Sequence, residues 1–324
     1  MITLLDMKEK EQKQLAADFI KSFSCSYAMA KTMGRVLDVQ EDELLLRSVI
    51  GFGSGVGTMG DTCGAVNGGV IALGRRFPNL PSPQFYSLCA EYFRRLNEKT
   101  GTLNCGEVHG GRELVPNLRR TILRGKTRQC TRILKEGSQI LAEMVEEFEK
   151  GNFQPEANPP IERMSDYFDG NSFHCAQSTI SRIGAESGLP VEHILAPSRG
   201  FCGGIGCNGT MCGAIAGGVL CLGLQEGVDL SQSGYRDTMR IMLYGILKGE
   251  GIFRDGKRFL PARLFARCRK LYRAVEEEFG GAHCRDILGL RLDSEEGSRE
   301  YIAENKIELC RGVVDTVARR VKAR

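Results

Sequence analysis

The chain has 324 residues, which is longer than one hydrophobic core usually serves, so we expect about two domains. Hydrophobic residues make up 42% and charged residues 26%, as in ordinary soluble globular proteins. No apolar run approaches the roughly 18 residues that a membrane span needs. The net charge of +4 is modest and the basic clusters are short, so we expect neither nucleic-acid binding nor membrane insertion.

The number of cysteines is high for a protein of this size. The N-terminal stretch MITLLDMKEKEQKQLA carries charges where a secretory signal would have its apolar region, so we expect a cytoplasmic protein. In a reducing compartment, clustered cysteines bind metals or perform redox chemistry more often than they form structural disulfides. The 13 cysteines therefore indicate a metal-binding or redox function.

The pattern of apolar residues predicts helices along the whole chain. Apolar positions three and four residues apart recur over 15–23, 43–50, 88–99, 130–150 and 310–323. Long alternating β-branched runs, which are typical of strands, are missing. The predicted fold class is all-α.

The second half of the chain repeats the glycines and cysteines of the first half. The stretch GFGSGVGTMGDTCGAVNGGVIALG begins at Gly51, and GFCGGIGCNGTMCGAIAGGVLCLG begins at Gly200. The two stretches align at an offset of 149 residues, and the offset is 150 upstream and 179 or 180 downstream. Ten of the cysteines form equivalent pairs, namely Cys25 and Cys175, Cys63 and Cys212, Cys89 and Cys268, Cys105 and Cys284, and Cys130 and Cys310. This pattern predicts an internal duplication.

A proline-rich segment separates the two halves. Pro155, Pro159 and Pro160 lie in KGNFQPEANPPIERMSDYFDGNS and interrupt any helix there. We therefore expect a first helical lobe over residues 1–150 and a second over residues 165–324, related by a pseudo-twofold axis or a translation. The change of offset predicts an insertion of about 30 residues in the second lobe, near 247–264.

The repeated stretch predicts a helix that begins at a cysteine. Asp61 and Thr210 precede Cys63 and Cys212 by two residues and are good N-cap residues, which would place each cysteine in a first helical turn. The unpaired N–H groups there favour thiolate over thiol. The helix would also have a face of small residues that a cofactor could approach closely, although tight packing on another helix is an alternative. The candidate cofactor-binding residues are Gly64, Gly68, Gly213 and Gly217.

The motif G-x-G-x-x-G occurs in both copies, as GVGTMG and GIGCNG. The residues before the first copy have a helical pattern, and no acidic residue lies at the required distance within a βαβ unit. The motif therefore does not predict a dinucleotide fold here. A loop that presents backbone N–H groups to a phosphate or a metal–sulfur site is consistent with it.

These features together resemble the C_GCAxxG_C_C family of redox-active proteins. The resemblance is carried by an early cysteine, a glycine-rich loop ending in C-G-A-x-x-G, a cysteine in a G-x-x-x-C turn and a late cysteine preceded by lysine. It covers nearly the whole chain as two tandem copies. The matching cysteines are Cys25, Cys63, Cys105 and Cys130 in the first lobe and Cys175, Cys212, Cys284 and Cys310 in the second.

The resemblance implies a redox role and an iron–sulfur cluster. A related module occurs in split-Soret cytochromes, where it accompanies an iron–sulfur-type centre. The chain has no C-x-x-C-H motif, so covalent c-type haem is not implied. The second lobe departs from the usual pattern because Cys202 and Cys207 stand where the first lobe has Gly53 and Thr58.

Four cysteines per lobe match the ligand number of an iron–sulfur cluster and also of a structural zinc site. Cys202 and Cys207 add two candidate ligands, so we expect the second lobe to hold the better-occupied or larger cluster. Cys89, Cys221 and Cys268 lie on helical faces and are expected to be packing residues. The candidate ligands are Cys25, Cys63, Cys105, Cys130, Cys175, Cys202, Cys207, Cys212, Cys284 and Cys310.

Lys126 and Lys306 lie four residues before Cys130 and Cys310, one helical turn away on the same face. Each would stabilise a thiolate or offset the negative charge of a cluster, and a solvated lysine is the alternative. The four histidines share no equivalent position, and ordinary polar or partly buried roles are expected for them.

The cysteine pattern and the family resemblance are compatible with three functions. The first is an electron-transfer protein with iron–sulfur clusters and an unknown donor or acceptor protein as its partner. The second is a metal-free thiol–disulfide oxidoreductase, which needs one close, reversible cysteine pair. The third is a zinc-stabilised interaction module. We favour the first, and the sequence is compatible with a homo-oligomer in each case.

Overall fold

The computed structural model describes residues 9–22, 24–111, 121, 123–155, 158–230, 234–248 and 261–322. The first part of the chain forms α1 (Glu9–Ser22), α2 (Cys25–Val36), α3 (Glu43–Ser48), η1 (Val49–Phe52), α4 (Gly64–Arg76), α5 (Ser82–Thr100), α6 (Cys105–His109) and α8 (Thr127–Glu149). The second part forms α9 (Pro159–Gly170), α10 (Cys175–Ser187), α11 (Glu192–Leu195), η2 (Arg199–Phe201), α12 (Gly213–Glu226), α13 (Tyr235–Lys248), α14 (Ala262–Phe279), α15 (Cys284–Leu288), α16 (Glu295–Ala303) and α17 (Ile307–Lys322). Within these ranges β structure is limited to two isolated bridges, and the all-α prediction is confirmed.

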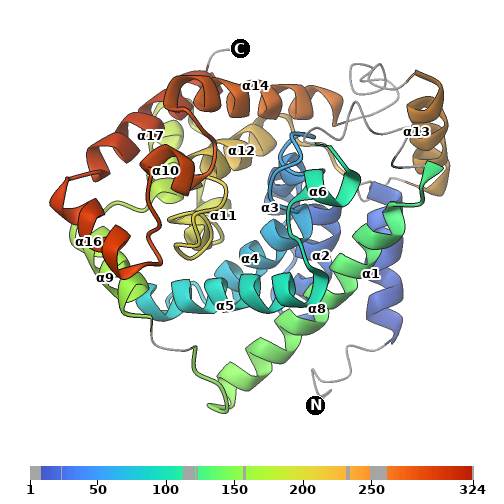
Figure 1. Ribbon diagram of the computed structural model, residues 1–324. Helices are drawn as coiled ribbons and strands as arrows, with labels where there is room; N and C mark the ends of the chain where they lie inside the picture. Colours follow the sequence, from blue (N-terminus) through green and yellow to red (C-terminus); the bar gives the residue numbers. More distant parts are fainter. Residues whose placement is uncertain are drawn as a thin grey trace.

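Each lobe is built around one central buried helix. In the first lobe α4 is buried from Gly64 to Gly74, and α2, α5 and α8 pack around it. In the second lobe α12 is buried from Gly213 to Leu224, and α10, α14 and α17 pack around it. In Figure 1 the blue-to-green helices of the first lobe lie beside the yellow-to-red helices of the second. A helix that is apolar all round must be covered on every side, which explains why these two helices lie at the centres of the lobes.

The two lobes meet through reciprocal contacts. Phe52 stacks on Phe201 at its equivalent position, with ring centroids 5.3 Å apart. A side chain at Gly51 would collide with Val219 and with Cys268 Sγ, and one at Gly200 would collide with the equivalent residues, Val70 and Cys89 Sγ. Each of these contacts recurs with the two lobes exchanged, and such reciprocal contacts are the mark of a twofold relation. The contacts therefore favour a pseudo-twofold axis over a translation.

The same contacts explain two cysteines outside the four-cysteine pattern. Cys89 and Cys268 are fully buried on α5 and α14, each against the glycine-rich segment of the other lobe. Cys221 is buried on the central helix α12. These positions agree with the packing role expected for the three residues.

The additional chain of the second lobe lies between α12 and α14. Only residues 77–81 separate α4 from α5, whereas residues 227–261 separate the equivalent helices α12 and α14. The additional chain therefore includes α13, which has no counterpart in the equivalent connection 77–81 and lies beside α1 at the edge of Figure 1. Residues 249–260 of the predicted segment 247–264 lie outside the described residues.

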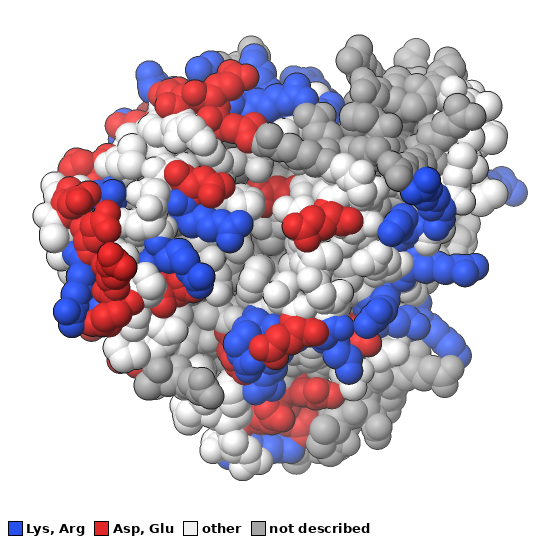
Figure 2. Space-filling model, viewed as in Figure 1, with Lys and Arg blue, Asp and Glu red and all other residues white. Residues whose placement is uncertain are grey.

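The surface in Figure 2 shows acidic and basic side chains interspersed, with no large field of one sign. Acidic groups gather along the margin where Figure 1 places α16. No helix in the described part of the chain combines the length and apolar character needed to cross a bilayer.

The stacked pair Phe52 and Phe201 should couple the stabilities of the two lobes. We expect Phe52→Ala and Phe201→Ala each to lower the free energy of unfolding by about 3–5 kcal/mol, and the double variant to lose less than the sum because both rings share one contact. Urea unfolding of the four proteins measures this coupling. Phe168→Ala, which removes a ring packed on Tyr301 within the second lobe, is the control and should be additive with Phe52→Ala. Full additivity of Phe52→Ala and Phe201→Ala would contradict the interface.

Candidate functional site

The four family cysteines of each lobe occupy equivalent places on equivalent helices. Cys25 and Cys175 are the first residues of α2 and α10, and Cys105 and Cys284 are the first residues of α6 and α15. Cys63 and Cys212 are the N-caps of α4 and α12. Cys130 and Cys310 lie in the first turns of α8 and α17. Three of the four positions are therefore helix N-termini, where unpaired N–H groups favour a negative sulfur.

Short backbone pairings hold the second and third cysteines together. In the first lobe the N–H of Cys63 donates to the Leu103 carbonyl at 2.8 Å, and the N–H of Cys105 donates to the Asp61 carbonyl at 2.9 Å. The second lobe repeats both bonds at its equivalent residues, with distances of 2.9 and 2.7 Å. The glycine-rich loop is thereby tied to the turn that carries the third cysteine.

In the second lobe the four family cysteines surround one small cavity. Its volume is about 20 Å³, which is enough for about one water molecule. Apart from the sulfurs its walls are almost wholly apolar. The lining residues include Cys175, Cys212, Cys284 and Cys310 together with Phe168, Phe173, Leu288, Leu292 and Val313. The tertiary structure thus brings together four cysteines that span residues 175–310.

In the first lobe the four family cysteines also share one neighbourhood. The hydrogen bond with Cys25 and burial together raise the pKa of Cys63 well above its usual value, and the nearby Cys105 and Cys130 add to this effect. Burial raises the pKa of Cys105 and raises that of Cys130 to about 12. Three of the four thiols are therefore neutral at pH 7, and Cys25 is the exception.

The pKa of Cys25 is lowered to about 7. The hydrogen bond from the Cys63 thiol lowers it most, burial opposes this, and the N–H groups of Ser54, Cys25 and Ser26 lower it further. Cys25 is partly exposed, whereas Cys63 is buried. The first lobe therefore holds a thiolate that accepts hydrogen bonds from a neighbouring thiol and from a helix N-terminus.

In the second lobe Cys202 takes the place of the Cys63 thiol as the partner of the early cysteine. The sulfurs of Cys175 and Cys202 lie 3.8 Å apart. The hydrogen bond between Cys175 and Cys202 lowers the pKa of Cys175 against the effect of burial, and the N–H of Gly203 contributes as Ser54 does in the first lobe. Cys207 is fully buried on the other side of Gly203, so both additional cysteines lie next to the four-cysteine cavity without lining it.

The glycine of the C-G-A motif makes room for the early cysteine. A Cβ at Gly64 would lie 2.5 Å from Cys25 Sγ, and one at Gly213 would lie 2.3 Å from Cys175 Sγ. Farther along each helix, a Cβ at Gly68 or Gly217 would collide with the backbone of α2 or α10. The small-residue face is therefore filled by a neighbouring helix, and cofactor contact by these four glycines stays a prediction.

The glycine-rich loops hold residues in an unfavourable backbone conformation. Val56 and its equivalent Ile205 have φ angles of 61° and 59°, and Thr58 and its equivalent Cys207 have 77° and 67°. For β-branched residues a positive φ is rare and costs about 1–3 kcal/mol. Both lobes retain this strain beside the cysteines, which is typical of a functional loop.

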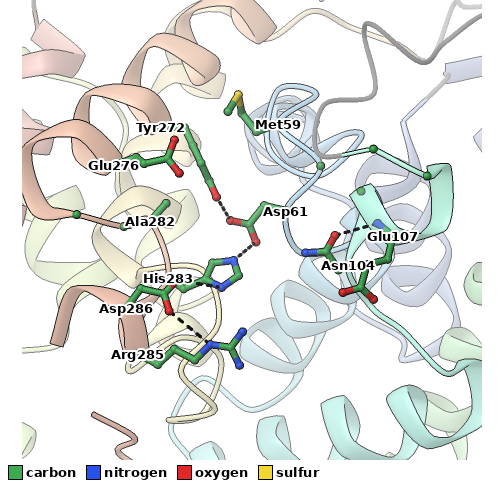
Figure 3. A pocket seen from close by; sticks show the side chains of 16 residues that line it. Met59, Asp61, Asn104, Glu107, Tyr272, Glu276, Ala282, His283, Arg285 and Asp286 are labelled. Atoms are coloured by element: carbon green, nitrogen blue, oxygen red, sulfur yellow. Dashed lines mark hydrogen bonds and ion pairs between the residues drawn. The ribbon is translucent and has the colours of Figure 1, made fainter. Parts of the chain in front are cut away.

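Asp61 does not cap the α4 helix, contrary to the sequence prediction. Cys63 is the N-cap residue, and the Asp61 carboxylate instead reaches the second lobe, where Tyr272 Oη donates to it at 2.6 Å and His283 Nε2 at 3.0 Å. Figure 3 shows this network in a cleft of about 640 Å³ between the lobes. Thr210 does not cap α12 either, since its hydroxyl donates to the Gly204 carbonyl.

The two lysines behave differently. Lys306 forms ion pairs with Glu304 at 3.1 Å and Glu300 at 3.5 Å and donates to the Leu288 carbonyl, so carboxylates already balance its charge. Lys126 lies close enough to His109 to contribute, after burial, to lowering the pKa of that imidazole to about 4. A direct effect of either lysine on a cysteine stays a prediction.

Side chains that the sequence did not single out also touch the cysteine sulfurs. His109 Nε2 lies 3.4 Å from Cys130 Sγ, and Tyr301 Oη donates to Cys310 Sγ at 3.4 Å. Tyr86 of the first lobe forms hydrogen bonds with Cys202 and, at 2.6 Å, with His174 Nδ1. Only His109 leaves a signal in the sequence, because the alignment places it opposite an apolar residue, Leu288.

The donor atoms fit an iron–sulfur cluster better than a preformed mononuclear site. Among the described residues no three His, Cys, Asp or Glu side chains are placed closely enough to hold one metal ion together. A multinuclear cluster needs its thiolates spread around it, and the second lobe has four cysteines around an apolar cavity. The type and number of donors fit, while the present cavity volume requires the cysteine side chains to turn outward on binding.

The Asp61–His283 pair should give the interface a defined pH dependence. Burial disfavours the Asp61 carboxylate, but hydrogen bonds from His283 and Tyr272 outweigh it and hold the pKa below 3.8, so this stabilisation is present above about pH 4 and lost on further acidification. The pKa of His283 is raised above 6.5 because Asp61 outweighs burial, so its stabilisation is complete below about pH 6.5 and lost as pH rises further.

We therefore expect His283→Asn to lower the free energy of unfolding by about 1.5–3 kcal/mol between about pH 4 and 6.5, and by less on either side. Denaturant unfolding across this pH range measures the difference. His193→Asn, which removes the more exposed contact with Asp42, is the control, with an expected loss below about 1 kcal/mol. A loss independent of pH would contradict the ion pair.

The Cys63 thiol should control the reactivity of Cys25. In the wild type the alkylation rate of Cys25 should rise with pH around a midpoint near 7, because the thiolate is the nucleophile. Cys63→Ala removes the donor while burial continues to act, so the midpoint should move above 9, whereas Cys63→Ser retains a donor and should keep it below 9. Mass spectrometry of iodoacetamide-labelled peptides measures both. Equal profiles for the two variants would show that the thiol does not stabilise the thiolate.

Comparison with known proteins agrees with this arrangement. The model of the C_GCAxxG_C_C family, described as "Putative redox-active protein (C_GCAxxG_C_C)", matches residues 23–144 and 173–323. An uncharacterized protein from Archaeoglobus fulgidus is 24% identical over 123 residues, which are 34% of this chain and 82% of that protein. No solved structure matches the chain. The two family matches fall one in each lobe, and the protein therefore belongs to the C_GCAxxG_C_C family of redox-active proteins.

Proposed function

We propose that the protein transfers electrons through iron–sulfur clusters held by the family cysteines of its two lobes. The observation that carries the proposal is the apolar cavity of the second lobe, which four cysteines from four separate helices surround. Iron–sulfur clusters are held by four thiolates, and low solvent access helps to set their potentials. The redox partner would be an electron donor or acceptor protein.

The neutral state of most thiols is compatible with this role. Burial raises the pKa of Cys284 and raises that of Cys310 to about 12, so their protons must leave when a metal binds. Binding therefore releases protons and becomes stronger as pH rises. Cys25 and Cys175, the cysteines with lowered pKa, are the first ligands available to incoming iron.

Zinc is the weaker alternative. Structural zinc sites usually take ligands from short motifs with two to four residues between cysteines, and they are tetrahedral and compact. The ligands here come from distant helices and surround a cavity, and the described residues hold no compact group of three donors. A zinc-stabilised interaction module would also leave the lowered pKa of Cys25 without a role.

The second lobe is proposed to hold the better-occupied or larger cluster. Cys202 Sγ lies 3.8 Å from Cys175 Sγ, which matches the separation of about 3.8 Å between two thiolates on one tetrahedral metal with bonds near 2.3 Å. Cys207 lies next to Gly203 on the same loop. Cys212 and at least one of these two loop cysteines would be ligands, and the loop cysteines stand where the first lobe has Gly53 and Thr58.

Thiol–disulfide exchange is a second candidate, and the pair of Cys175 and Cys202 favours it. The lowered pKa of Cys175 makes it the attacking thiolate, which would form a mixed disulfide with a disulfide substrate and release a substrate thiolate. Cys202 would then attack Cys175, forming the internal disulfide and releasing the second thiol of the reduced substrate. Two electrons pass from the cysteine pair to the substrate, and the two substrate thiolates take up one proton from the Cys202 thiol and the one that Cys175 released on ionising.

Anaerobic purification with analysis of iron, sulfide and zinc decides among these functions. We expect iron and acid-labile sulfide in equal amounts and visible absorption that bleaches on reduction with dithionite. A colourless protein that contains zinc would support the interaction module. A metal-free protein in which Cys175 and Cys202 cycle between thiol and disulfide would support the exchange reaction.

Serine variants test the difference between the lobes. Serine retains the shape of cysteine but is a poor ligand for iron, because a hard hydroxyl replaces a soft thiolate. We expect the double variant Cys202→Ser/Cys207→Ser to lose more iron and visible absorption than Cys63→Ser. Cys268→Ser, a buried cysteine outside both sites, is the control and should retain its iron. Unchanged iron content in the double variant would contradict the assignment to the second lobe.

A further inference from the structure

In the described part of the chain, His109 is a buried histidine with only one of its two ring nitrogens in a polar contact. It ends α6 and is 5% exposed, with Nε2 directed at Cys130 Sγ at 3.4 Å. Its second ring nitrogen, Nδ1, is buried and finds no hydrogen-bond partner among the residues that the structure describes. An unpaired polar atom in the protein interior costs about 1–3 kcal/mol, so packing alone is a poor explanation for an imidazole at this position.

The second lobe shows what this position faces. The repeat places Leu288 opposite His109, and Leu288 lines the cavity formed by the four cysteines of its lobe. Both residues lie at the end of the short helix that begins at the third family cysteine, in α6 and α15 respectively. The equivalent position in the first lobe therefore points a nitrogen donor at the cysteine site, where the second lobe has an apolar wall.

The distance between the two donor atoms fits a shared metal. With metal–sulfur bonds near 2.3 Å, metal–nitrogen bonds near 2.0–2.1 Å and tetrahedral angles, a bound nitrogen and sulfur lie about 3.5 Å apart. The separation of His109 Nε2 and Cys130 Sγ is 3.4 Å. The pair could therefore bind one metal atom with little movement of either side chain.

We propose that His109 Nε2 is a metal ligand in the first lobe, which makes that centre a mixed cysteine–histidine site while the second lobe has only cysteine ligands. This inference rests on the proposed cluster-binding function. A neutral imidazole in place of a thiolate removes one negative charge from a cluster, and histidine ligation raises the potential of [2Fe–2S] centres. The first centre would then have the higher potential, and electrons would pass from the second lobe to the first.

A reciprocal exchange of the two equivalent residues tests the ligand assignment. His109→Leu gives the first lobe the residue of the second, and Leu288→His gives the second lobe the residue of the first. Pulsed EPR of the dithionite-reduced, cluster-containing protein detects nitrogen hyperfine coupling, and redox titration measures the potentials. We expect strong nitrogen coupling in the wild type, its loss in His109→Leu, and a lower potential for the first centre in that variant.

His174→Asn, which changes a histidine beside the second lobe's cysteines, is the control and should retain the coupling. Thermal unfolding followed by circular dichroism shows whether each variant is folded, and Leu288→His supplies an independent gain of coupling if His109→Leu does not fold. Nitrogen coupling that persists in a folded His109→Leu variant, or that is absent from the wild type with clusters present, would overturn the inference while leaving the proposed function intact.

If the wild type takes up no cluster, the proposed function fails, and Co²⁺ alone then decides the role of His109. Co²⁺ is added to the reduced protein in a Cys175→Ser/Cys202→Ser/Cys212→Ser/Cys284→Ser background, which removes four of the six candidate ligands of the second lobe, the close pair of Cys175 and Cys202 included. Absorption bands of thiolate-bound Co²⁺ report binding to the first lobe. We expect His109→Leu to weaken this binding at least about tenfold. Equal Co²⁺ affinity with and without His109, or no binding at all, would overturn the inference.

Discussion

The arrangement of each lobe depends on the close contact between one cysteine sulfur and one glycine. The sulfur of Cys25 occupies the space where a side chain at Gly64 would lie, and Cys175 relates to Gly213 in the same way. Because the glycine has no Cβ, the helix that begins at the early cysteine can cross the start of the central helix directly. This crossing brings the N-termini of both helices, and the cysteine at each, to one point. Any larger residue would separate the two helices and disperse the cysteines.

The same contact determines the electrostatics of the site. The hydrogen bond from the Cys63 thiol lowers the pKa of Cys25 most, burial opposes it, and the N–H groups at the start of α2 and of Ser54 in the strained loop lower it further, to about 7. The other family thiols lie in apolar surroundings that keep them protonated. Each lobe therefore combines one cysteine of lowered pKa with several neutral thiols, a state that is ready to exchange protons for metal or to form a disulfide with the neighbouring thiol.

The two lobes share this framework but differ in the residues added to it. The second lobe places Cys202 beside the early cysteine, and the first lobe places His109 beside the late one. The interface is asymmetric as well, because Asp61, Tyr272 and His283 form a network whose equivalents are Thr210, Phe93 and Asn104. Duplication would supply two equal sites, and substitutions at a few equivalent positions would then make them chemically different.

The sequence by itself determined the all-α class, the repeat of the cysteine pattern and the packing role of Cys89 and Cys268, because helical periodicity and a fixed offset are properties of the chain alone. It did not determine what lies opposite a given side chain. Asp61 is of a residue type favoured at helix N-caps, yet its carboxylate accepts hydrogen bonds from residues more than 200 positions away. The small-residue face of the central helix is filled by a neighbouring helix. A change of offset indicates an insertion but does not locate its ends. The cavity, the thiol pairs and the place of His109 depend on how separate helices cross, and only the tertiary structure decides such contacts.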